Sequence, residues 1–79
     1  MNDLPRRVLS TLLISGAQSP ERAVSSDDLA IQFGFEKGKL QSEIEALGRG
    51  GYVQSVMRDD VRLVYLSLTG VLAASSIYS

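Results

Sequence analysis

Apolar side chains recur at helical spacing near the start of the chain. Leu4, Val8 and Leu12 are separated by four residues each, which predicts one broad apolar face on a first helix. Asn2 or Asp3 lies where a helix-capping side chain is expected. The segment after this helix, residues 16–25, contains glycine, serine and proline and is predicted to be a loop.

A second helix is predicted from about residue 26. Ser25 or Ser26, followed by two aspartates, can satisfy the free backbone N–H groups at a helix start, and carboxylates suit the positive end of the helix dipole. We therefore interpret the acidic pair as capping chemistry in preference to a metal site. Leu29, Ala30 and Phe33 form the apolar stripe, and Gly34 ends the helix.

A third helix is predicted over about residues 36–48. Leu40, Ile44 and Leu47 fall within one narrow arc at 100° per residue and are expected to face the core. The opposite arc carries small and polar side chains and is expected to face a partner. Its members are Gly38, Ser42, Glu45 and Arg49, flanked by Lys39, Gln41 and Ala46.

Two apolar runs, YVQSVM and VRLVYLSL, follow after a glycine-rich stretch and predict a β-hairpin with a turn of two to four residues. In the second run Val64, Leu66 and Leu68 alternate onto one face. Thr69 is expected to cap a short last helix over about residues 70–78.

This order of elements predicts an α+β, mostly α, winged helix-turn-helix fold. It comprises three helices, a two-stranded wing hairpin and a short C-terminal helix. We expect residues 1–79 to form one domain, with the helix-turn-helix over about residues 26–49, the wing over about 52–68 and the last helix over about 70–78.

The apolar skeleton of residues 29–53 resembles that of the MarR-type and ArsR-type transcriptional regulators of bacteria and archaea. Its members are Leu29, Ala30, Gly34, Phe35, Leu40, Ile44, Leu47, Gly51, Tyr52 and Val53, and SLTG at residues 67–70 is similar to the end of the wing in those families. The resemblance covers more than half of the chain. It implies that the third helix enters the major groove of double-stranded DNA and that the wing touches the neighbouring backbone.

Carried over by position, the resemblance implies a set of DNA-contacting residues on the third helix and the wing. These are Lys37, Gly38, Lys39, Gln41 and Ser42 on the helix, and Arg58 and Arg62 on the wing. Basic and amide side chains can bind base edges, serine can bind phosphate, and glycine permits close approach of the backbone. The alternative for the lysines is a purely solubilising role.

The charge of the chain leaves a second function open. The formal net charge is −1, and residues 34–53 carry three basic and three acidic side chains. DNA-binding surfaces are usually basic, so any positive patch must be local. A winged helix that binds another protein through the face of Glu45 and Arg49, without nucleic acid, is therefore the alternative.

The absence of cysteine and histidine argues against catalysis. It removes thiolate nucleophiles, disulfides, the usual metal ligands and the commonest general base near neutral pH. We expect no enzyme activity, no metal and no cofactor. No convincing signal peptide or membrane span is evident, so we expect a cytoplasmic protein with no membrane partner.

No charged residue follows Arg62. Side chains such as Leu72, Ile77 and Tyr78 are therefore expected to cover apolar surface. They can pack on the first helix of the same chain, or they can form the contact of a homodimer, as in the families that the sequence resembles. Two recognition helices one turn of DNA apart would then bind a pseudopalindrome. The sequence leaves a small-molecule effector undetermined.

Overall fold

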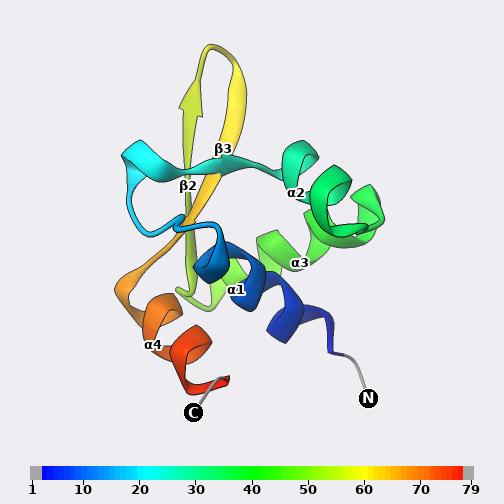
Figure 1. Ribbon diagram of the computed structural model, residues 1–79. Helices are drawn as coiled ribbons and strands as arrows, with labels where there is room; N and C mark the ends of the chain where they lie inside the picture. Colours follow the sequence, from blue (N-terminus) through cyan, green and yellow to red (C-terminus); the bar gives the residue numbers. More distant parts are fainter. Residues whose placement is uncertain (1–2, 78–79) are drawn as a thin grey trace.

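The computed structural model describes residues 3–77, which fold as four α-helices and a small antiparallel sheet (Figure 1). The helices are α1 (Leu4–Ile14), α2 (Ser26–Phe33), α3 (Lys37–Arg49) and α4 (Leu68–Ile77), and the strands are β1 (Val24–Ser25), β2 (Val53–Arg58) and β3 (Val61–Leu66). A short 3₁₀ turn, η1 (Pro20–Arg22), precedes β1. The predicted winged helix-turn-helix fold is confirmed.

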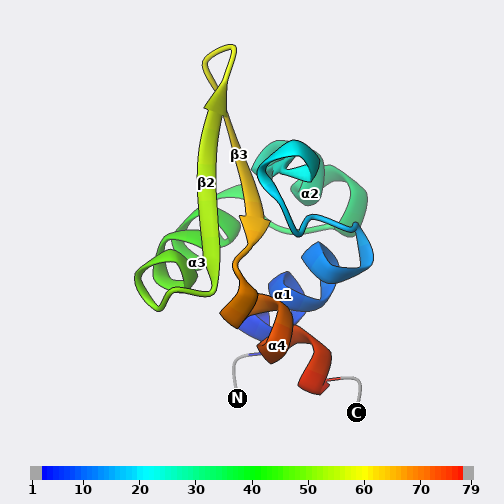
Figure 2. The ribbon, with the colours of Figure 1, turned by 90° about the vertical axis from the view of Figure 1, so that its left-hand side faces the viewer.

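The sheet has the order β1-β3-β2, with both pairs antiparallel. The wing hairpin pairs Val53 with Leu66 and Arg58 with Val61. Its two turn residues, Asp59 and Asp60, have positive φ angles of 52° and 64°. Two-residue turns of this kind match the twist of hairpin strands, and aspartate tolerates this conformation better than most residues. The hairpin extends well beyond the helices in both views (Figures 1 and 2).

The core lies where α1, α2, α3 and the base of the hairpin meet. All three predicted core residues of α3 are buried, together with Leu29 and Ala30 of α2. Gly34 ends α2 in the left-handed conformation, at φ 73° and ψ 30°. Phe35 then turns inward and is only 8% exposed. The predicted helix end at Gly34 is confirmed.

Several local predictions were wrong. The predicted loop contains η1 and β1, and β1 was missed because two residues are too few to show alternation. Asp3 occupies the N-cap position of α1 but makes no side-chain capping bond. Asn2 lies outside the described residues. The third helix begins at Lys37, one residue later than predicted, because Glu36 is still extended (φ −73°, ψ 127°).

The end of the wing also differs from prediction. The strand stops at Leu66, so Leu68 begins α4 and is 76% exposed instead of sharing a strand face with Val64 and Leu66. The cap is Ser67, whose Oγ accepts a hydrogen bond from the N–H of Gly70 at 3.1 Å, and not Thr69. Gly70 is buried against the backbone of Tyr52. A Cβ atom on residue 70 would lie 1.9 Å from the Tyr52 carbonyl oxygen. Only glycine permits this approach.

Candidate nucleic-acid interface

The outer face of α3 is open to solvent along its length. Gly38, Ser42, Glu45 and Arg49 are all exposed, as the helical spacing predicts. The helix packs on α1, α2 and β2 through its opposite, buried face. In Figure 2, α3 lies beside the base of the hairpin, which rises past it. This arrangement leaves the helix and the wing free to contact a single large ligand.

The two lysines of α3 lie on either side of Gly38, and each forms an ion pair. Lys37 Nζ lies 3.6 Å from a carboxylate oxygen of Asp27 on α2, and Lys39 Nζ lies 3.6 Å from one of Glu36. All four side chains are between 66% and 72% exposed. Exposed pairs of this kind contribute only about 0–1 kcal/mol, so a phosphate can replace the carboxylate at little cost.

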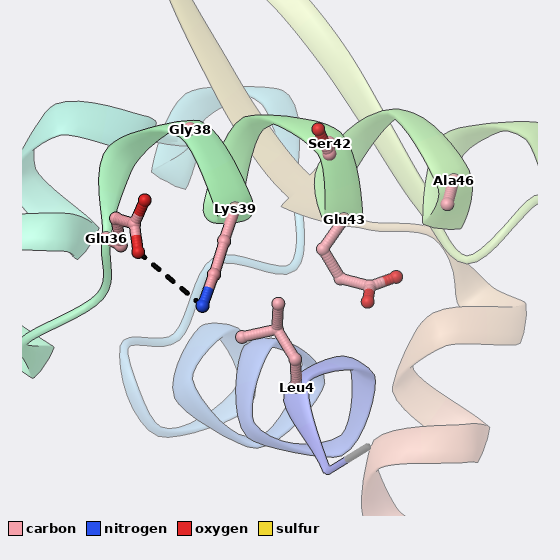
Figure 3. A pocket seen from close by; sticks show the side chains of 7 residues that line it. All are labelled: Leu4, Glu36, Gly38, Lys39, Ser42, Glu43 and Ala46. Carbon is pink, nitrogen blue, oxygen red and sulfur yellow. Dashed lines mark ion pairs between the residues drawn. The ribbon is translucent and has the colours of Figure 1, made fainter.

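Lys39 faces a hollow between α3 and the start of α1 (Figure 3). Leu4 forms the α1 side of this hollow, and Glu36 and Glu43 place two carboxylates on its α3 side. Gly38, Ser42 and Ala46 complete the lining. This flank of α3 is therefore a mixture of one positive and two negative side chains.

On the other flank, Gln41 and Arg62 line a second hollow, between α3, the start of α2 and the wing. Arg62 is half-buried, and its Nε donates a hydrogen bond to Ser55 Oγ at 3.2 Å across the hairpin. Asp27 and Asp60 line the same hollow. The structure thus brings the predicted residues Gln41 and Arg62 together from elements that are distant in sequence.

Arg58 does not join this group. Pairing of Arg58 with Val61, and of Met57 with Arg62, places the two arginines on opposite faces of the hairpin. Arg58 instead donates a hydrogen bond to the carbonyl oxygen of Pro20 in η1, at 3.1 Å. Sequence reasoning treated both arginines as one wing surface and missed this division, although strand alternation could have shown it.

Arg58 also influences Glu21, the middle residue of η1. The pKa of Glu21 lies below its ordinary value because the carboxylate accepts a hydrogen bond from its own backbone N–H and another from Ser19, with attraction from Arg58. The contact that attaches the wing to η1 is the hydrogen bond from Arg58 to Pro20. Met57, 66% exposed on the Arg62 face, is a further wing residue that the sequence analysis did not select.

The surface of α3 and the wing is electrically balanced. It carries five basic and five acidic side chains between residues 36 and 62. Glu45 and Arg49 lie four residues apart on α3 but do not pair, because the ion pairs of residues 3–77 are those of Lys37 and Lys39. Arg49 thus adds an unneutralised charge at the far end of the exposed face.

The predicted dimer residues lie on or beyond α4. Leu72 is 65% exposed, Ile77 is the last residue of the helix, and Tyr78 lies outside the described residues. Leu68, one turn before Leu72, extends the same outward face. The opposite face of α4 packs on α1 and contains the buried Ala74, so the packing expected within the chain also occurs.

No protein-family model matches this sequence, and no curated protein matches it either. Solved structures do resemble it. TubR from Bacillus megaterium pBM400 has a TM-score of 0.88 at 14% identity, covering 99% of this chain and 87% of TubR. A candidate DNA-binding protein from Ralstonia eutropha JMP134 has a TM-score of 0.84 at 16% identity, covering 100% and 99% of the two chains.

A third similar structure is a DNA complex. Staphylococcus aureus MepR bound to DNA has a TM-score of 0.80 at 11% identity, and the similarity covers 99% of this chain and 62% of MepR. At such identities the comparisons establish a shared fold. Within residues 3–77, no helix combines the length and apolar character needed to cross a lipid bilayer.

Proposed function

We propose that this protein binds double-stranded DNA and regulates transcription, with α3 in the major groove and the wing on the adjacent backbone. The observation that carries the proposal is the exposed face of α3 beside the hairpin, with Gln41 and Arg62 lining one hollow. MepR, which has the same fold, has been seen bound to DNA. A role for DNA also explains why two lysines flank an exposed glycine at the start of α3.

The proposed contacts divide by chemistry. Gln41 suits an adenine edge, and Lys37, Lys39 and Ser42 suit phosphate or guanine. Gly38 leaves room for the backbone to approach the DNA, and Arg62 reaches the backbone from the wing. Arg58 joins them only after its hydrogen bond to Pro20 is exchanged for one to phosphate. We also propose a cytoplasmic homodimer that contacts DNA through two copies of α3.

Binding of a protein partner through the face of Glu45 and Arg49 is the second candidate. The equal numbers of basic and acidic side chains on α3 and the wing favour it, because phosphate contacts provide most DNA affinity. The two candidates differ in their dependence on salt. DNA binding weakens steeply as the salt concentration rises. Binding of a protein to a face with equal numbers of positive and negative side chains is less affected.

Fluorescence anisotropy with a labelled random-sequence duplex, repeated from low to physiological salt, tests the proposal. Lys39→Gln should weaken binding several-fold. It should also reduce the salt slope, meaning the steepness with which the logarithm of the binding constant falls with the logarithm of salt concentration, by about 0.9, the value for one lost phosphate contact. The matched control is Arg6→Gln, which removes the same charge from the exposed side of α1. In vitro selection of duplexes would then define any preferred sequence.

The proposal fails if the wild-type protein shows no binding at low salt. It also fails if Lys39→Gln and Arg6→Gln have equal effects, because the lysine would then contribute only to net charge. Absence of DNA binding together with a salt-insensitive protein complex would establish the second candidate.

A further inference from the structure

Arg7 connects α1 to the turn of the helix-turn-helix. Its guanidinium carbon lies 4.7 Å from the centroid of the Phe35 ring, within the range of a cation–π contact. One of its terminal nitrogens also donates a long hydrogen bond, 3.5 Å, to the carbonyl oxygen of Phe33. Arg7 thus contacts the residues on both sides of Gly34.

The turn that Arg7 contacts determines where α3 begins. Gly34 reverses the chain after α2, Phe35 inserts into the core, and α3 starts two residues later at Lys37. Within the motif, the N–H of Phe35 is bonded to the carbonyl oxygen of Ala30 at 3.1 Å. A displacement of Phe35 would therefore move the first turn of α3, which carries the residues proposed to contact DNA.

We propose that Arg7 is a positioning residue for the recognition helix, a proposal that rests on the proposed function. Arginine suits this position because its planar guanidinium can stack on an aromatic ring while its N–H groups donate to a carbonyl. The contact fixes the turn relative to α1, against which α3 also packs. Arg7 acts through Phe35 and Phe33 and does not itself touch DNA.

The neighbouring arginine provides an internal comparison. Arg6 and Arg7 are adjacent, both are exposed, and both line the same shallow hollow on α1. Among the contacts of residues 3–77, the ring contact and the carbonyl bond belong to Arg7 and not to Arg6. If α1 needed only positive charge, substitution of either arginine would have the same effect. If Arg7 positions the turn, only its substitution should disturb the turn.

The test compares Arg7→Met, Arg7→Lys and the control Arg6→Met. Amide hydrogen exchange is measured at Phe35, in the turn, and at Leu66, whose N–H is bonded to the Ala17 carbonyl at 2.7 Å, far from the turn in sequence. DNA affinity is measured by anisotropy with the random duplex over a range of salt. Arg7→Lys retains the charge but loses the planar group, so it should fall between wild type and Arg7→Met.

We expect Arg7→Met to accelerate exchange at Phe35 and to weaken DNA binding by about twofold to fivefold, the effect of losing one exposed cation–π contact. Exchange at Leu66 and the salt slope should not change, and Arg6→Met should leave exchange at Phe35 as in wild type. A salt slope reduced by about 0.9 would overturn the proposal, because it would make Arg7 a phosphate contact.

Two other outcomes would also overturn it. Equal acceleration at Phe35 and Leu66 would show that Arg7 stabilises the whole fold, and unchanged DNA affinity would show that the turn does not position α3. If the wild-type protein binds no DNA, the proposed function fails, but the exchange data still decide whether Arg7 holds the turn.

Discussion

Gly38 is a residue that the fold itself does not require. A Cβ atom built at this position would meet no atom within 4 Å, and the residue lies inside α3. Glycine within a helix costs up to about 1 kcal/mol relative to alanine, and Gly38 lies in the first turn of α3. Because neither packing nor backbone conformation explains this cost, close approach of a ligand to the helix is the explanation that we favour.

Gly38→Ala should therefore separate stability from binding. We expect the free energy of unfolding, measured with urea, to rise by about 0.5–1 kcal/mol, and DNA affinity to fall. Gly48→Ala is the control, since it lies in the same helix and its Cβ would make ordinary contacts with Val53, at 3.9 Å and beyond. Improved stability with unchanged DNA affinity in Gly38→Ala would contradict the proposed close approach.

The carboxylates that pair with the lysines should limit binding to arbitrary DNA. Glu36→Gln frees Lys39 and removes a charge that repels phosphate, so affinity for the random duplex should rise several-fold. Stability should change by less than about 1 kcal/mol because the pair is exposed. Asp3→Asn, which removes a negative charge from the start of α1, serves as the control. Equal gains from both substitutions would show an effect of net charge alone.

At the scale of elements, Ser67 joins the wing, α4 and the end of α3. Its N–H donates to the Tyr52 carbonyl oxygen at 3.1 Å, its hydroxyl donates to the Gly51 carbonyl oxygen, and its Oγ caps α4 at Gly70. The first turn of α4 consequently rests on the turn between α3 and β2. This junction fixes α4 relative to the recognition helix.

Ser67→Ala should lower the free energy of unfolding by about 1–2 kcal/mol, because it removes a helix cap and leaves the Gly51 carbonyl without this donor. Thr69→Ala should have little effect, since Thr69 is exposed and is not the cap. Urea denaturation followed by circular dichroism provides both values. A larger loss in Thr69→Ala than in Ser67→Ala would contradict the capping assignment.

At the scale of the whole molecule, α4 presents an outward face that contains no charged residue. Leu68 and Leu72 project from it, and no Lys, Arg, Asp or Glu occurs after Arg62. In a twofold dimer each surface meets the same surface of the other subunit. An uncharged apolar strip can pack against its own copy, whereas two strips that carry the same charge repel each other. This compatibility supports a homodimer through α4.

Leu72→Glu should convert a dimer into a monomer, as measured by light scattering, because it places like charges opposite each other across the twofold axis. The control is Ile31→Glu, at an apolar position on α2 that is also well exposed, which should leave the mass unchanged. DNA affinity should fall in Leu72→Glu, since two half-sites are no longer joined. A monomeric wild-type protein, or a dimer that persists in Leu72→Glu, would contradict this arrangement.

The helices and the main core residues could be predicted from sequence because amphipathic spacing and capping signals are local. The spacing of Leu40, Ile44 and Leu47 located α3 and its exposed face, and the glycines before and after them marked its approximate ends. The boundary between β3 and α4 was predicted wrongly because it depends on contacts that are not local. Alternation continued to Leu68, and the bonds that stop the strand come from residues 51 and 52, which are remote in sequence.

The sequence by itself therefore determined the order of the four helices and the wing hairpin, the core faces of α1, α2 and α3, and the inventory of charges. Only the tertiary structure decided how those charges are placed: Arg58 against η1, Arg62 beside Gln41, and each lysine beside a carboxylate. The physical reason is that periodicity reports which side of an element is buried, whereas ion pairs and hollows depend on elements that meet only in the folded chain.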